Sequence, residues 1–540
     1  QREGSRSSGS VAGDAAMGTL VRSGLLLNLL ARACGWNISW ARPPAAKRTF
    51  NSTLVNWVVH ELGENILPSD LGTLFSNCLP NTLDTTVLHS PDARAGEPDS
   101  FVITGDIPAL WLRDSMNQVL PYIRLLNVSI KAGKPDPDLE RLLFGLVHRH
   151  ASSVEIDPFA NAFAWWGKNG QTGSNRGDLT YKEFEAGGGQ VNAMQDPRLF
   201  ERKFELDSLL SFLKLSSAMF EVLPAEAARR FHEDAAFVPA VKSVLGTLED
   251  MQSCSSVSYS FQRQTTQPTD TLSHGVGFPC TDTGMIRTHF RPSDDAVIFA
   301  FNVPGNAMAA TELSRFAPLL ARLQALDAQS PLPWAAGLGP LARQLSRLEA
   351  SVRAGLAAHG TMRFKGETVF AYEVDGFGNA IFMDDANVPS LLSLPFLGFV
   401  EATDPVYLAT RRMVLSHNNP WYFDGLVGIR GVGGPHTGAN FIWPMSLMIQ
   451  AWTSSNVQEV STLLQQLMTA SAPNSLMHES FNKDTLSAFT RKWFAWANTL
   501  FGDLVLKIAT HPELYRAANL SQPVDLVALV GRQPGAAIMT

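Results

Sequence analysis

Apolar side chains recur every three to four positions along most of the chain, which is the spacing of one face of an α-helix. Asp404 can cap one such segment, and Pro405 suits its first helical position, where no N–H donor is needed. Strand signals are few, at Ser256–Phe261 and Thr368–Val374. We therefore expect a mostly helical chain with short strands. The predicted helices are Ile107–Leu126, Leu206–Leu223, Leu341–Ala358, Pro405–Ser416, Phe441–Thr453, Val457–Ala470 and Leu486–Ala509.

Two architectures suit so many helices. An α-solenoid would show a repeat of about 34–47 residues, and no such period is found in this chain. A closed toroid of helix pairs needs no repeat. Long loops rich in Gly, Asp and Trp, such as Gly167–Arg202 and Gly275–Pro304, separate the periodic segments. Because long loops at one end of a closed scaffold commonly carry a site, the toroid is the expected architecture.

The chain divides into a lead, one long domain and a tail. Residues 1–48 are expected to be a targeting or disordered lead, residues 49–522 the folded domain, and residues 523–540 a frayed tail. One Pro/Gly-rich interruption lies within 326–340, and its length suits a surface loop rather than a domain joint.

The lead contains a weak targeting signal. If Met17 is the start, Arg22 followed by the apolar run Leu25–Leu30 resembles a signal peptide. Localisation in the secretory pathway or outside the cell is therefore expected, with the cytoplasm as the alternative. No apolar run reaches the roughly 20 residues that span a bilayer, so stable membrane insertion is not expected.

Composition narrows the class of protein. Hydrophobic residues make up 45% of the 540 and charged residues 17%, so the chain can bury a large core and is not disordered throughout. The net charge of −7 provides no basic excess for a phosphate backbone, which argues against nucleic acid as a partner.

The four cysteines are Cys34, Cys78, Cys254 and Cys280, and their spacing matches no zinc or redox motif. Buried or free thiols are the first interpretation. In a secreted chain one disulfide is the alternative, and Cys254–Cys280 is then the easiest loop to close.

Candidate chemistry lies in acidic residues set among apolar and aromatic neighbours. The chain contains no GxSxG, GxxxxGK[ST], HExxH or GxGxxG motif. A partly buried carboxylate needs hydrogen bonds or a partner, so several of them predict a polar pocket that would suit a sugar. Glycoside cleavage needs two carboxyl groups. The acidic clusters are Gly105–Ser115, Phe204–Ser208, Phe290–Ala296, Glu373–Asp375, Met383–Pro389 and Met477–Phe481.

A purely structural interpretation also exists for single acids. Asp106, Asp207 and Ser293 each precede an apolar periodic stretch and suit helix N-caps, and Asp384–Asp385 suits a turn. Six clusters, however, exceed what capping requires.

Five segments closely resemble glycoside hydrolase family 125. The resemblance covers roughly Asn51 to Leu520, and the stretch within 326–340 lies outside the family pattern. It implies an all-α fold, an (α/α)6 barrel, and a metal-independent exo-α-1,6-mannosidase that needs no cofactor. The segments are GDIPALWLRDS (105–115), FERKFELDS (200–208), FRPSDDA (290–296), YEVDGFGNAIFMDDANVPSLL (372–392) and HESFNKDTLSAFTRKWFAWAN (478–498).

The resemblance also implies roles for single residues. Cleavage would proceed with inversion, with Glu479 as the general base and Asp294 as the general acid; Asp295 stays open as the alternative acid, because on a helix only one of the two neighbours would face the pocket. We expect burial to raise the pKa of Asp294. The implied substrate-binding residues are Trp111, Arg113, Asp114, Asp207, Arg291, Asp385, Asn387 and His478.

The expected partner is a mannose-containing oligosaccharide or N-glycan. Three alternatives stay open: a catalytically silent glycan-binding protein on the same fold, a glycosidase for another sugar or linkage, and a metal-dependent mannosidase, since a fold does not fix a substrate. An inverting pair of carboxyl groups should lie about 6.5–9.5 Å apart.

Overall fold

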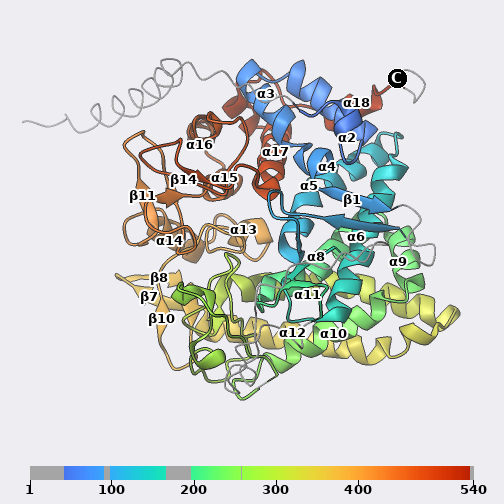
Figure 1. Cartoon of the computed structure of the whole chain (residues 1–540), viewed down its shortest axis with the longest axis vertical. Helices are drawn as coiled ribbons and strands as arrows, with labels where there is room; N and C mark the ends of the chain where they lie inside the picture. Colours follow the sequence, from blue (N-terminus) through green and yellow to red (C-terminus); the bar gives the residue numbers. More distant parts are fainter. Residues whose placement is uncertain (1–41, 91–97, 166–195, 257, 535–540) are drawn as a thin grey trace, which may run out of the picture.

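The computed structural model describes residues 42–90, 98–165, 196–256 and 258–534, and its helices form an (α/α)6 barrel (Figure 1). The fold class therefore agrees with the prediction. The helices of the first half are α2 (Thr53–Val58), α3 (Ser69–Cys78), α4 (Asn81–Thr85), α5 (Leu112–Lys131), α6 (Pro137–Ile156), α8 (Leu206–Val222), α9 (Pro224–Glu233) and α10 (Phe237–Asp250). Those of the second half are α11 (Val303–Gln329), α12 (Leu338–His359), α13 (Leu394–Leu397), α14 (Pro405–Val414), α15 (Pro444–Trp452), α16 (Val457–Ser471), α17 (Ala495–Thr510) and α18 (Leu526–Gly531).

The helices close into a ring. Among the inner helices, α17 packs against α5, α5 against α8, and α8 against α11. Outer helices cover them, with α12 against α11 and α16 against α15. The first helices also meet the last, because α3 packs against α17 and α2 against α18, as the neighbouring blue and red ribbons of Figure 1 show. This closure is what distinguishes the toroid from a solenoid.

Short antiparallel strands fix the starts of the inner helices. In the three-stranded sheets β3-β4-β5, β10-β9-β6 and β13-β14-β15, β3 leads into α5, β6 into α11 and β13 into α15. The strands are β1 (Val87–Ser90), β2 (Asp99–Val102), β3 (Leu110–Trp111), β4 (Ala162–Phe163), β5 (Leu199–Glu201), β6 (Phe301–Asn302), β7 (Thr361–Phe364), β8 (Glu367–Phe370), β9 (Glu373–Val374), β10 (Ala380–Ile381), β11 (Tyr422–Asp424), β12 (Arg430–Val432), β13 (Phe441–Ile442), β14 (Ser480–Asn482) and β15 (Phe489–Thr490).

These strands explain where the sequence-based boundaries were wrong. The helices expected from Ile107, Phe441 and Leu486 begin later, at α5, α15 and α17, since β3, β13 and β15 occupy their first residues. Buried strand residues are as apolar as buried helix residues, so periodicity alone does not separate them. The strand expected at Ser256–Phe261 is wrong for its described residues, which form turns and loop. Thr368–Val374 is confirmed in part, as β8 and β9.

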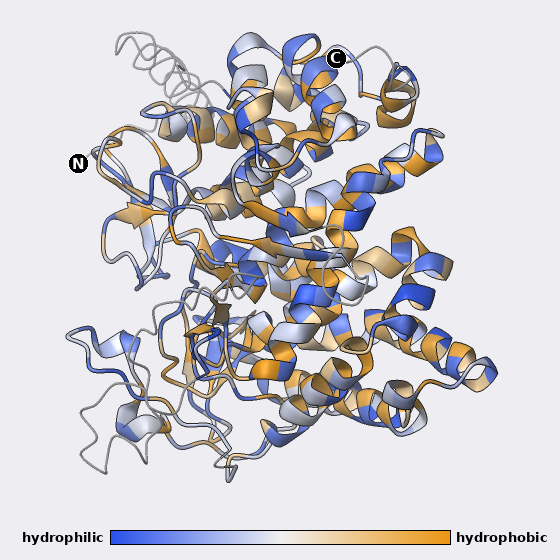
Figure 2. Ribbon diagram, turned by 45° about the vertical axis from the view of Figure 1, so that its right-hand side comes forward, coloured by the Kyte–Doolittle hydropathy of each residue, from blue (hydrophilic) through white to orange (hydrophobic). Residues whose placement is uncertain are grey.

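The apolar faces of the helices build one continuous core, and Figure 2 shows the alternation of apolar and polar faces along them. In α8, the side chains of Leu209, Leu210 and Leu213 are buried. The predicted cap of α14 is confirmed, because the Asp404 carboxylate accepts a hydrogen bond of 2.8 Å from the Tyr407 N–H.

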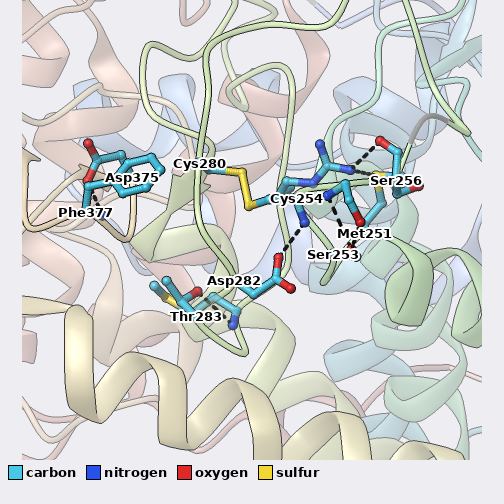
Figure 3. The surroundings of a disulfide bond; sticks show 12 residues. Met251, Ser253, Cys254, Ser256, Cys280, Asp282, Thr283, Asp375 and Phe377 are labelled. Carbon is cyan, nitrogen blue, oxygen red and sulfur yellow. Dashed lines mark hydrogen bonds between the residues drawn. A yellow bond between two sulfur atoms is a disulfide. The ribbon is translucent and has the colours of Figure 1, made fainter.

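A disulfide joins Cys254 to Cys280, with 5.7 Å between their Cα atoms (Figure 3). The Asp282 carboxylate accepts a hydrogen bond from the Cys254 N–H beside it. The disulfide alternative is therefore the correct one for this pair. Cys78 is free and buried, and Cys34 lies outside the described residues.

The Pro/Gly-rich stretch 326–340 contains the end of α11, a surface loop and the start of α12. The Trp334 indole N–H donates to the His232 carbonyl in the last turn of α9, which fixes the loop to this helix. Part of the predicted frayed tail, residues 523–540, is helical: α18 forms there and buries Leu529 and Val530. No helix in the described ranges is long and apolar enough to cross a membrane.

Candidate active site

A cavity of about 160 Å³ lies at the N-terminal ends of α5, α15 and α17. Both carboxylates predicted to be catalytic, Asp294 and Glu479, line it, and they come from loops far apart in the sequence. The lining residues are Thr104, Ile107, Trp111, Arg113, Asp114, Ser293, Asp294, Asn387, His436, Trp443, Glu479, Arg491 and Phe494.

The first turn of α5 provides Arg113 and Asp114. The helix begins there because Trp111 is in extended β3 and the Leu112 N–H donates to the Asn161 carbonyl next to β4. The Trp111 ring packs edge-on against Phe200, with centroids 5.3 Å apart. One apolar contact and one backbone bond thus hold the start of α5 at the cavity.

Arg113 is the charge centre of the site. Its guanidinium lies within 4 Å of four carboxylates: 2.6 Å from Glu205, 3.3 Å from Asp294, 3.4 Å from Asp114 and 3.5 Å from Asp207. Burial penalises the charged form of each of these carboxyl groups, so protonation of some of them is favoured. Burial raises the pKa of both Asp114 and Asp207 to about 6.

Asp294 lies in a turn rather than on a helix, which corrects the expectation. The Asp294 N–H donates to the Arg291 carbonyl, and Asp294 adopts a left-handed φ of 70°. The segment Asp385–Asn387 supports the turn from behind: the Ser293 hydroxyl donates to Asp385 at 2.6 Å, and the Asn387 amide donates to the Pro292 carbonyl at 2.7 Å.

The turn separates the two neighbouring acids. Asp294 lines the cavity, whereas the buried Asp295 lies behind it, 3.8 Å from the His436 ring. Burial lowers the pKa of His436, but its hydrogen bond to Asp295 and the charge of Glu479 outweigh burial and raise that pKa to about 9. His436 is therefore a cation at neutral pH.

The expectation of a raised pKa for Asp294 is wrong for the unliganded protein. Burial acts to raise it, but Arg113, a hydrogen bond from Glu205, and Lys203 together hold the pKa of Asp294 below its ordinary value. The pKa of Glu205 is raised well above its ordinary value, chiefly by burial. The charges around Asp294 thus outweigh the effect of its burial.

Glu479 precedes β14 and is held by α17. Asn498 accepts from the Met477 N–H at 2.9 Å and so positions the HES segment. The Arg491 guanidinium lies 3.7 Å from Glu479. His478 turns the other way, with its ring stacked on Phe489 at a centroid distance of 3.7 Å.

Comparison with known proteins identifies the family. Residues 68–506 match the profile of the family described as metal-independent alpha-mannosidase (GH125). The chain belongs to glycoside hydrolase family 125. It is 40% identical over 487 residues to the Meiotically up-regulated gene 157 protein of Schizosaccharomyces pombe, covering 87% of this chain and 88% of the relative.

A solved structure of a metal-independent alpha mannosidase from Streptococcus pneumoniae is also similar. It is 33% identical, with a TM-score of 0.72, covers 85% of this chain and 99% of its own, and holds alpha-1,6-mannobiose in a non-productive complex. The family assignment and this likeness support glycosidase activity of the α-mannosidase type for the family 125 chain described here.

Not every predicted residue of this family 125 chain reaches the cavity. Trp111, Arg113, Asp114 and Asn387 line it. Four others lie behind the lining: Asp207 beside Arg113, Asp385 beneath the Ser293 hydroxyl, His478 on Phe489, and Arg291 in a buried ion pair of 2.6 Å with Glu373.

The structural interpretation of single acids also needs correction. Asp106 caps no helix but pairs with Arg491, and Asp207 lies inside the first turn of α8, where Glu205 takes the N-cap position. Ser293 lies in the Asp294 turn, and its hydroxyl donates to Asp385.

Sequence reasoning missed several residues of the site. Glu205 and Arg491 lie in the segments 200–208 and 478–498, which resemble the family, but neither is among the predicted site residues, and nothing local to Asn161, His436 or Trp443 marks them as members of the site. Only the closed barrel brings them to Arg113, Asp294 and Glu479. The local signals that did predict site residues are the segments 111–115 (WLRDS) and 478–480 (HES).

A larger cavity, of about 310 Å³, lies among the later turns of α5 and α8, the middle of α11, and α13. It contains neither predicted catalytic carboxylate. Burial there lowers the pKa of Lys214 to about 8. The smaller cavity is the candidate active site because it holds the paired acids. Across the described ranges, no group of three or more His, Cys, Asp or Glu side chains is arranged to hold a metal ion.

Proposed function

We propose that this protein is an inverting, exo-acting α-mannosidase that hydrolyses terminal non-reducing α-1,6-linked mannose from mannose-containing oligosaccharides or N-glycans. The observation that carries the proposal is the presence of Asp294 and Glu479 in one cavity at the helix N-termini. The alpha-1,6-mannobiose bound by the Streptococcus pneumoniae relative supports the linkage.

In this mechanism the two carboxyl groups act on opposite sides of the scissile bond. Asp294 donates a proton to the departing glycosidic oxygen, while Glu479 removes a proton from a water molecule that attacks the anomeric carbon. A separation of about 6.5–9.5 Å would leave room for that water molecule. Arg491, 3.7 Å from Glu479, would hold the base in position.

Polar and aromatic groups of the cavity suit one sugar ring. The Trp111 indole N–H and the Asn387 amide oxygen are buried without a hydrogen-bond partner in the described part of the chain. Sugar hydroxyls can bond to both. A volume of about 160 Å³ is well below the roughly 300–1,000 Å³ of pockets for drug-sized ligands, which favours a single terminal residue and exo action.

The test is hydrolysis of α-1,6-mannobiose beside its α-1,2 and α-1,3 isomers, with the first anomer released followed by proton NMR. We expect mannose from the α-1,6 isomer alone and β-mannose as the initial product. Cleavage of another isomer would support a different linkage specificity. Binding of the disaccharide without turnover would support a catalytically silent glycan-binding protein. Loss of turnover in excess EDTA would favour a metal-dependent enzyme.

We also propose that the protein works in the secretory pathway or outside the cell, because the Cys254–Cys280 disulfide suits an oxidising compartment. Fractionation of cells that express the natural full-length protein tests this. Recovery in the cytoplasm with both thiols reduced would contradict it.

A further inference from the structure

Glu205 and Asp294 share their hydrogen-bond donors. Arg113 donates from Nη1 to Glu205 at 2.6 Å and from Nη2 to Asp294 at 3.3 Å. The Asn161 side-chain amide donates to Glu205 at 3.1 Å and to Asp294 at 3.5 Å. A parallel backbone bridge between Glu205 and Phe290 holds the start of α8 against the Asp294 turn. Two carboxyl groups are thus held together by two shared donors.

The surrounding charges do not allow every carboxyl group of this cluster to ionise. Arg113 and Asp114 of α5 and Asp207 of α8 face the pair. Two further groups, Lys203 and His436, face it from the loops. Lys203 is itself close to Glu201 and Asp270, and its ammonium donates to the Asp294 carbonyl. Two buried carboxyl groups joined by a hydrogen bond cannot both ionise readily, so they share one proton.

The two carboxyl groups differ in solvent exposure. The side chain of Glu205 is fully buried, whereas 22% of the Asp294 side chain is exposed, toward the cavity. Burial penalises the charged form most at Glu205. The raised pKa of Glu205 and the lowered pKa of Asp294 agree with a proton on Glu205 in the unliganded protein.

We propose that Glu205 and Asp294 form a proton-sharing pair, in which Glu205 is a positioning residue that stores the proton of the general acid and passes it to Asp294. This inference rests on the proposed function. It resolves a difficulty of that function, since Asp294 in the resting site is charged and a charged carboxylate cannot act as an acid.

The step balances without another reactant. The proton moves from Glu205 to Asp294 along their hydrogen bond and then to the glycosidic oxygen, which takes the electron pair of the broken C–O bond. Water forms the new bond to the anomeric carbon and gives a proton to Glu479. The pair is left with two negative charges until solvent returns one proton.

The test compares the pH dependence of kcat/KM in two variants. Glu205→Gln keeps a neutral hydrogen-bond donor beside Asp294 but has no proton to pass on, and Arg113 stays in place, so Asp294 must hold the proton alone and loses it at lower pH. We expect the basic limb of the profile to move down by more than about one pH unit, so that activity at pH 7 falls more than about tenfold and recovers toward acid pH. Glu205→Asp keeps a carboxyl group and should retain most of the wild-type limb.

A matched control is Ser208→Ala, which removes a 2.6 Å hydrogen bond to the same Glu205 oxygen without changing charge. It should leave the limb in place. A Glu205→Gln enzyme that keeps the wild-type limb, or loses activity equally at every pH, would overturn the proton-sharing pair while leaving the proposed function intact. A fully active Asp294→Asn enzyme would also overturn the pair, whereas a wild-type protein that hydrolyses no mannobiose would contradict the proposed function.

An independent measurement covers the case in which the Glu205→Gln variant does not fold. Infrared spectra of the wild-type protein with carbon-13 labelled glutamate should contain, at pH 7, the shifted C=O stretch of a protonated carboxylic acid, and Glu205→Asp should remove that band. Absence of the band from the wild-type protein would overturn the inference.

Discussion

The Arg113 guanidinium and the Asp294 carboxylate lie 3.3 Å apart and join the first turn of α5 to the turn that precedes β6 and α11. This ion pair places the proposed acid at the edge of the cavity and favours the ionised form of its carboxyl group. It also connects the start of α5 to the loop before α11, so the same contact serves the fold and the site.

The first prediction separates the two neighbouring acids. Asp294→Asn should lower kcat by more than about 100-fold, because the proton donor is lost. Asp295→Asn should lower kcat much less, since its carboxylate lies behind the turn near His436. Both are measured on α-1,6-mannobiose, with circular dichroism as the check on folding. The reverse order of activity would assign the acid to Asp295.

Arg113→Lys should be damaging despite keeping the charge. A single ammonium group cannot reach Glu205, Asp294 and Asp207 in the fork geometry of a guanidinium. We expect a loss of about 3 kcal/mol in the free energy of unfolding, measured by urea titration, and little remaining activity.

The control for Arg113→Lys is Arg412→Lys, which alters an exposed ion pair with Glu367. It should change the free energy of unfolding by less than about 0.5 kcal/mol. Equal effects of the two replacements would contradict the central place given to Arg113.

His436 should make stability depend on pH. Its pKa in the folded protein, about 9, lies above the ordinary value of 6.5, so its charged form stabilises the fold fully below pH 6.5. That contribution, roughly 1 kcal/mol for a partly exposed group, is lost as pH rises through 9. His436→Gln should flatten the fall in unfolding free energy between pH 6.5 and 9. If the variant shows the same fall in unfolding free energy between pH 6.5 and 9, the titrating group is not His436.

Removal of the disulfide should destabilise the protein without touching the site. Replacing Cys254 and Cys280 by Ser opens a loop closed over a separation of 26 residues and should cost about 3 kcal/mol in unfolding free energy. Urea unfolding with and without reductant checks this: the wild-type protein should respond to reductant and the double variant should not. If reductant does not change the urea midpoint of the wild-type protein, the disulfide does not stabilise the fold as predicted.

The cap of α14 offers a smaller and sharper test. Asp404→Ala removes the acceptor of the Tyr407 N–H and should lower the free energy of unfolding by about 1 kcal/mol. Asp404→Ser restores an acceptor and should recover most of the loss. Equal stability of all three proteins would show that the cap contributes nothing.

Part of the fold could be predicted because several helices carry a local signal, whereas α6, α10 and α11 were not predicted. The apolar period of α8 and the Asp404-Pro405 start of α14 are local, and both elements form where expected. The starts of α5, α15 and α17 were missed because strand pairing with distant segments, such as β3 with β4, determines them. No local pattern encodes a partner some 50 residues away.

The candidate site was likewise predicted only where its residues carry a local signal. Asp294 and Glu479 lie in the segments 290–296 and 478–498, which resemble the family, so both could be predicted from the sequence. The surroundings of Asp294 could not be read, because Arg113, Lys203 and Glu205 reach it only through the closed ring. Their charges reverse the effect of burial, which is why the expected direction of its pKa was wrong.

The most direct test of the account is a crystal structure of the protein with a bound, uncleaved mannose disaccharide. We expect the terminal mannose in the Arg113 cavity, with the Asp294 and Glu479 carboxyl groups on opposite faces of its ring and about 6.5–9.5 Å apart. A separation near about 5 Å would contradict inversion. A sugar bound away from both carboxylates would contradict the active site itself.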